Sequence, residues 1–110
     1  TKKTLSDIFN TKEKEITPDL IKKTVSKYYN VKISDLESPK RSQNIVYPRQ
    51  IAIYLIRQNC PTFSFPKIGE VFGGRDHTTI MHSYEKIERE IESVPNLKAT
   101  ILKLQELIDE

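Results

Sequence analysis

Residues 66–80 read PKIGEVFGGRDHTTI, and this stretch decides the fold. It encodes a short helix, a tight turn at Gly73 and Gly74, and a longer helix for which Asp76 is a suitable N-cap. A short helix, a glycine turn and a second helix in this order are typical of a helix-turn-helix. The stretch therefore predicts that motif, with its second helix running from Asp76 to about Glu92.

The chain on either side of this motif also has a helical pattern. Thr17, Pro18 and Asp19 form a helix start, with a cap, a proline in the first turn and an acid beside it. No alternating segment of strand length bounded by turns occurs in the sequence. We therefore expect an all-α domain of five or six helices, which lie over 18–29, a short turn capped by Ser34 and Asp35, 44–59, 65–72 capped by Ser64, 76–92 and 96–108.

The second long helix, over 44–59, is expected to be one-sided. Apolar residues at helical spacing line one side of it, and three polar residues lie off that side. The apolar side carries Ile45, Ile51 and Leu55, and the polar positions are Arg49, Gln50 and Arg57. Pro48 falls in the first turns of this helix, and Pro61 ends it.

Length and composition exclude several classes of protein. The chain has 110 residues, which is the size of one domain, and a single cysteine that cannot form an internal disulfide. No apolar run approaches the roughly 18 residues of a membrane span, and the start of the chain lacks a signal-peptide pattern. Large multidomain enzymes, disulfide scaffolds and membrane proteins are excluded. Because the first residue is Thr1, we expect a cytoplasmic piece of a longer protein.

Positive charge is concentrated in the middle of the chain. The formal net charge is +3, and within it residues 39–89 carry +4 while residues 90–110 carry −3. Every arginine lies between 41 and 89, and arginine is suited to bidentate contacts with phosphates and guanine edges. The segment indicates a polyanionic partner, although charge alone is equally compatible with an ordinary solvated surface.

The longer helix of the motif presents a polar face. With Ile80, Tyr84, Ile87 and Ile91 facing inward, the side chains expected to point away are Thr78, His82 and Arg89, with Thr79, Ser83 and Lys86 to one side. In a helix-turn-helix the second helix enters the major groove, where carboxylates and threonine methyl groups read base edges. The alternative interpretation is a plain helix cap with polar neighbours.

Catalytic and metal-binding interpretations find little support. Asp76 and His77 are sequence neighbours at a helix start, a spacing that does not make a base and its orienting partner. Cys60 lies in an expected loop, with nothing to mark it as a nucleophile, and is expected to be a small buried or half-buried residue. His77 and His82 are five residues apart, about 140° around a helix, so they cannot chelate one metal. We predict no catalytic residues and no metal site.

Three strings in the sequence carry a resemblance to a known family. They are GGRDHTT at 73–79, FPKIG at 65–69 and YPRQIA at 47–52. In this order and spacing, over roughly residues 16–92, they closely resemble the C-terminal DNA-binding domain (domain IV) of DnaA, the family of bacterial chromosomal replication initiators. The resemblance implies a helical bundle containing a helix-turn-helix of the Trp-repressor type.

The resemblance also implies which residues contact DNA. Those expected to contact bases are Arg41, Pro66, Asp76, His77 and Thr78. Arg41 matches an arginine that enters the minor groove, where a narrow A/T-rich groove attracts positive charge, and Pro66 matches a residue that packs on a thymine methyl. Those expected to contact phosphates, which fix register without specifying sequence, are Arg49, Gln50, Arg57, Lys67, Thr79 and Lys86.

The function implied by the resemblance is sequence-specific binding of double-stranded DNA. The family recognises the DnaA box, a short asymmetric element repeated at replication origins, and thereby serves initiation and regulation of chromosome replication. We accordingly expect a non-enzymatic protein of the bacterial cytoplasm that associates with the nucleoid. The isolated domain is expected to be a monomer.

The family's nucleotide-binding AAA+ module is absent from this sequence, because no G-x-x-x-x-G-K-[ST] string occurs. No cofactor is expected here, and ATP would bind only in that module, which belongs to the rest of the initiator protein. We expect residues 1–15 to be a linker tail and residues 16–110 to be the DNA-binding domain. In the family this junction has been linked to acidic phospholipids; residues 2–9 support such a contact weakly, and a plain hinge is the favoured interpretation.

Two other interpretations stay open from the residues. The first is a helix-turn-helix transcription factor of another family, which would bind a palindromic site as a dimer. The second is a protein-interaction module whose exposed helix docks a partner protein. The clustered arginines argue against the second.

Overall fold

The computed structural model describes residues 16–109. In this part of the chain there are helices and no strands, which confirms the predicted all-α class. The helices are α2 (Pro18–Tyr29), α3 (Ile33–Glu37), α4 (Gln43–Asn59), α5 (Phe65–Val71), α6 (His77–Ser93) and α7 (Pro95–Asp109). The linker tail predicted over residues 1–15 lies outside the described residues.

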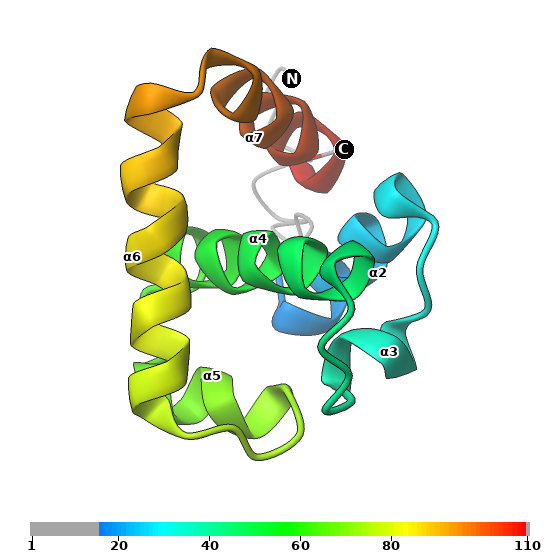
Figure 1. Cartoon of the computed structure of the whole chain (residues 1–110), viewed down its shortest axis with the longest axis vertical. Coiled ribbons are helices and arrows are strands. Elements are labelled where there is room, and N and C mark those ends of the chain that lie inside the picture. The colour runs from blue at the N-terminus through cyan, green and yellow to red at the C-terminus, as the bar shows by residue number, and fades with distance from the viewer. Residues whose placement is uncertain (1–15, 110) are drawn as a thin grey trace, which may run out of the picture.

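Helix α4 is the centre of the molecule. Figure 1 shows it crossing between α6 on one side and α2 and α3 on the other, with α7 above it and α5 below it in this view. All five of these helices contact it. The run from Ile51 to Ile53, and then Leu55 and Ile56, is almost wholly buried. The predicted one-sided pattern for this helix is therefore wrong, because neighbours cover it nearly all round; even Pro48 and Arg49 are buried.

Side-chain caps explain where three of the helices in the described chain begin, namely α2, α5 and α6. The hydroxyl of Thr17 accepts a hydrogen bond from the backbone N–H of Leu20 at 3.2 Å, as predicted for the start of α2. Asn30 ends that helix in the left-handed conformation, with φ at 57°. The predicted cap of α3 is wrong: the helix begins at Ile33, one residue before Ser34, and has no side-chain cap.

The helix-turn-helix consists of α5 and α6, which pack together through Ile68, Phe72 and Ile80. The approach of the turn to α5 requires glycine at position 69, because a Cβ there would overlap the carbonyl oxygen of Arg75. The carbonyl of Gly69 itself accepts hydrogen bonds from the N–H groups of Gly74 and Arg75, both at 2.9 Å. The chain therefore folds back tightly on α5 before α6 begins.

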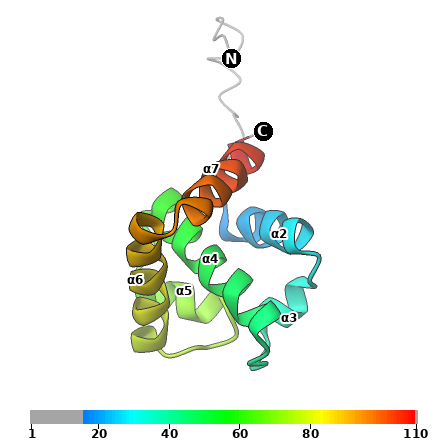
Figure 2. The same cartoon turned by 45° about the horizontal axis from the view of Figure 1, so that its top comes forward.

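Helix α7 packs onto the domain. Its buried residues Leu97, Leu104 and Ile108 belong to the same hydrophobic core as the other helices. It contacts α2, α6 and α4, and Figure 2 shows it lying across the end of α6 and beside α2. The α5 end of the molecule, where α6 begins, is therefore left uncovered by α7.

Candidate nucleic-acid interface

The first turn of α6 presents four polar side chains to solvent. Asp76, His77, Thr78 and Thr79 are all exposed. One carboxylate oxygen of Asp76 accepts the N–H of Thr78 at 3.2 Å and so caps the helix. The other lies 4.0 Å from Nδ1 of His77, and the two side chains are 68% and 56% exposed. The predicted cap is confirmed, and it leaves these groups accessible to a partner.

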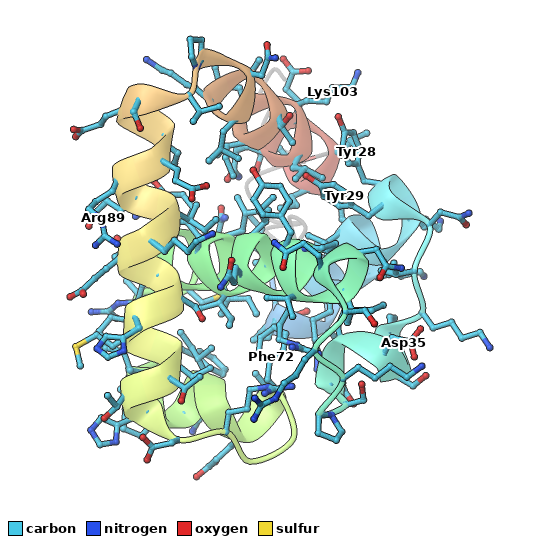
Figure 3. The ribbon with its side chains drawn as sticks, in the orientation of Figure 1. Tyr28, Tyr29, Asp35, Phe72, Arg89 and Lys103 are labelled. Carbon is cyan, nitrogen blue, oxygen red and sulfur yellow. The ribbon has the colours of Figure 1, made fainter. Side chains whose placement is uncertain are left out.

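The rest of α6 follows its apolar stripe with one exception. Ile80 and Ile87 are buried, and His82 and Arg89 are exposed as expected. Figure 3 shows Arg89 pointing away from the rest of the domain. Ser83, expected on the polar side, is buried, so the face that could meet a groove is narrower than the sequence suggested.

The predicted base-contacting residue Pro66 lies at a different place from the first turn of α6. It is exposed at the start of α5 together with Lys67, whose amine lies 5.6 Å from the ring centroid of Phe63. The neighbouring ring of Phe65 lies 5.7 Å from that of Tyr84. This contact sets the start of α5 beside the middle of α6, about two turns beyond its first residues.

Arg41 lies in the loop that joins α3 to α4, and it is exposed. Figure 1 shows this loop at the same end of the molecule as α5 and the beginning of α6. The structure therefore brings the loop of the predicted minor-groove residue and the first turn of α6 to one end of the fold.

The predicted phosphate-contacting residues on α4 and α6 are partly engaged with each other. The amine of Lys86 lies 3.5 Å from the side-chain oxygen of Gln50 and 3.1 Å from a carboxylate oxygen of Glu90. Both Gln50 and Lys86 are half-buried. Arg57, by contrast, donates to the carbonyls of Pro61 and Phe63, at 3.4 and 3.0 Å, and so closes the loop after α4.

Arg49 has a role in the scaffold that its sequence position did not reveal. It is 6% exposed, and its guanidinium donates to the carbonyls of Leu36, Asp35 and Ser38 at 2.8, 3.2 and 2.9 Å. Burial, with Arg75 nearby, lowers the pKa of Arg49 to about 10, which leaves it charged at neutral pH. Its predicted phosphate contact stays a prediction, with little exposed surface to support it.

Arg75 was missed as a functional candidate, although it lies inside the decisive stretch between the glycine turn and Asp76. Its guanidinium donates to the carbonyl of Ser38. Its Nε is buried and has no hydrogen-bond partner among residues 16–109. Burial, together with Arg41, lowers the pKa of Arg75 below its usual range.

Metal binding and membrane insertion have no support in the described part of the chain. Among residues 16–109, no three His, Cys, Asp or Glu side chains gather closely enough to hold a metal ion, and no helix is long and apolar enough to cross a membrane. Cys60 is buried, as expected, and burial raises the pKa of its thiol.

Comparisons with known proteins agree on one family. The family model described as the bacterial dnaA protein helix-turn-helix matches residues 18–87. The chromosomal replication initiator protein DnaA of Caldanaerobacter subterraneus subsp. tengcongensis is 51% identical over 108 residues, which are 98% of this chain and 24% of that protein. A crystal structure of a DNA replication initiation factor superposes with a TM-score of 0.72 at 29% identity, over 97% of this chain and 33% of that one. The chain thus spans about a quarter of the curated relative's length.

Proposed function

Because the chain belongs to the bacterial DnaA helix-turn-helix family, we propose that it binds double-stranded DNA sequence-specifically at DnaA boxes in a replication origin. In this role it serves the initiation and regulation of bacterial chromosome replication. The other parts of an initiator protein would supply ATP binding, and this domain would recognise the DNA sequence at which the protein binds.

The observation that carries the proposal is the first turn of α6. Three side chains of different chemistry, those of Asp76, His77 and Thr78, are exposed at the start of the second helix of a helix-turn-helix. That is the end of the helix that contacts base edges in this motif. A carboxylate accepts from cytosine N4, and a threonine methyl packs on a thymine methyl.

The neighbouring residues supply the remaining contacts in the proposed complex. Arg41 enters the minor groove next to the major groove that α6 occupies, and Pro66 packs on a base from the start of α5. Lys67, Thr79 and Lys86 lie around α5 and α6, where they contact phosphates and fix the position of the helix on the duplex. Gln50 and Arg57 are assigned the same role.

Fluorescence anisotropy tests the proposal. A labelled duplex with one DnaA box is compared with a shuffled duplex, each at low and near-physiological salt. We expect a preference for the box that survives at the higher salt. Salt weakens the phosphate contacts on both duplexes alike, whereas the contacts with base edges depend little on salt and are made only on the box. Equal affinities that decline together would reduce the function to non-specific phosphate attraction.

Stoichiometry separates this proposal from a dimeric transcription factor. An asymmetric box is expected to hold one domain, and the free domain is expected to be a monomer. Light scattering of the protein alone and of its complex with one box measures both. Two copies per duplex, with higher affinity for a palindrome, would favour the alternative family.

The remaining parts of the proposal concern the protein's surroundings. The domain acts without catalysis in the bacterial cytoplasm, on the nucleoid, and is joined to the rest of the initiator through residues 1–15. A contact with acidic phospholipids would involve those same residues, which lie outside the described range. Sedimentation with anionic and with neutral vesicles tests it; equal binding to both kinds would contradict a headgroup contact.

A further inference from the structure

Two arginines from distant parts of the chain converge on one backbone carbonyl. Ser38, directly after α3, accepts hydrogen bonds from Arg49 on α4 and from Arg75 in the turn before α6. The two partners lie 11 and 37 residues away in sequence. Charge-assisted hydrogen bonds of this kind are stronger than neutral ones, so this carbonyl is a firm point of attachment.

The glycine turn is fastened to the same place by two further contacts. Gly73 has φ at +82°, and a Cβ there would overlap the carbonyl oxygen of Glu37, so the turn lies directly against the end of α3. The buried amine of Lys22 joins the two segments as well, since it contacts the carboxylate of Glu37 and the carbonyl of Val71. Figure 3 shows Phe72 in this region, between α5 and α3.

The attachment connects the two predicted DNA-reading segments. Arg41 follows Ser38 by three residues, and α6 begins two residues after Arg75. Through the bond between Arg75 and the Ser38 carbonyl, the loop of Arg41 and the first turn of α6 are therefore linked by a short path. A minor-groove arginine and a major-groove helix must hold a fixed relative position to contact neighbouring grooves together.

We propose that Arg75 is a positioning residue, which holds the loop of Arg41 in register with α6 so that both grooves are read at once. This inference rests on the proposed function. Arg75 acts on specificity through Arg41, without a base contact of its own. The arrangement gathers like charges in one place, and the negative potential of a DNA groove offsets their repulsion in the complex.

The competing explanation is that Arg75 simply contacts a phosphate. The two explanations differ in what the loss of Arg75 does. A phosphate contact would be lost equally on any DNA and independently of Arg41. A positioning role would be lost mainly on the box, and only when Arg41 is present to be positioned.

A double-mutant cycle makes this distinction. Affinities for the box and for the shuffled duplex are measured for the wild type, Arg41→Ala, Arg75→Ala and the double variant. Lys103→Ala is the matched control, because it removes one positive charge from the exposed face of α7, far from the α5 end (Figure 3). Thermal melting followed by circular dichroism establishes that each variant is folded at the assay temperature.

Positioning predicts a strongly non-additive cycle. Each single substitution should weaken box binding about tenfold, the worth of one good groove contact. In the Arg41→Ala background, Arg75→Ala should change box affinity by less than about twofold, and on the shuffled duplex it should resemble Lys103→Ala. Losses that multiply, or equal losses on both duplexes, would overturn the inference. A wild type without preference for the box would instead refute the proposed function.

Arg75→Lys keeps the experiment decisive if the alanine variant unfolds. Lysine retains the charge, so a phosphate contact would survive, but it lacks the planar guanidinium that reaches the Ser38 carbonyl. Positioning predicts weaker box binding for Arg75→Lys that disappears in the Arg41→Ala background. Unchanged box affinity for Arg75→Lys would contradict the proposal.

Discussion

At the level of single residues, the first turn of α6 separates structural from recognition roles within one motif. Asp76 both caps the helix and presents its second carboxylate oxygen to solvent. Thr78 contributes its backbone N–H to that cap, while its side chain is exposed and takes no part in the cap. The Thr78 side chain can therefore be removed without loss of the cap.

Thr78→Ala and His77→Ala are expected to weaken binding to the box by about 1–3 kcal/mol, the worth of a good base contact. Their effect on a shuffled duplex should be small, because neither residue is needed to attract phosphates. Anisotropy titrations of both duplexes measure the difference. Equal losses on the two duplexes would contradict a role in base reading.

Arg49→Ala is expected to act through stability. Its removal takes the side-chain donor from the Leu36 carbonyl and one of the donors from the carbonyls of Asp35 and Ser38, a loss of about 1–3 kcal/mol in the free energy of unfolding. Urea unfolding followed by circular dichroism measures it, with Arg89→Ala as the control for an exposed arginine on α6. A stability equal to the wild type, with weaker binding to every duplex, would show that Arg49 contacts phosphates instead.

At the level of elements, the turn between α5 and α6 depends on two glycines for different reasons. Both have positive φ, at +82° for Gly73 and +80° for Gly74. A Cβ on Gly73 would also overlap the carbonyl of Glu37, whereas one on Gly74 would meet open space. Only the first glycine therefore controls how closely the turn approaches α3.

The two glycines are a matched pair for mutation. Gly74→Ala should lower the free energy of unfolding by about 1–2 kcal/mol, the cost of the left-handed conformation with a side chain. Gly73→Ala should lower it further, because the backbone at Glu37 must move as well. Urea denaturation compares them, and equal losses would mean that the contact with α3 is unimportant.

Most elements could be predicted from the sequence because their signals are local. Caps such as Thr17, Ser64 and Asp76 and the spacing of apolar residues indicate where helices begin and which side is buried. The burial of Arg49 and the contact between Arg75 and Ser38 could not be predicted in this way. They depend on which helix becomes central and on contacts between segments far apart in sequence, and neither leaves a periodic pattern.

At the level of the whole molecule, α7 extends the domain beyond residues 18–87, the part matched by the family model. Its apolar residues enter the core shared by α2, α4 and α6, and it lies away from the end that carries Arg41 and the first turn of α6. We therefore expect α7 to contribute to stability and to contribute little to DNA contact.

Leu104→Ala should lower the free energy of unfolding by about 2–5 kcal/mol, because that side chain is fully buried. Leu102→Ala in the same helix is the control, since Leu102 is 57% exposed and its loss should change stability by less than about 0.5 kcal/mol. Urea denaturation measures both. A small effect of Leu104→Ala would mean that α7 folds apart from the core.

The most direct test of the account is to map the DNA-binding surface with isotopically labelled protein. Amide chemical shifts are recorded by NMR as a duplex with one DnaA box is added at near-physiological salt, and again with a shuffled duplex. We predict that the large, box-specific changes occur at 41–43, at Lys67 and at 76–82, with α7 nearly unchanged. Changes centred on α2 and α7, or identical changes with both duplexes, would contradict sequence reading by the start of α6.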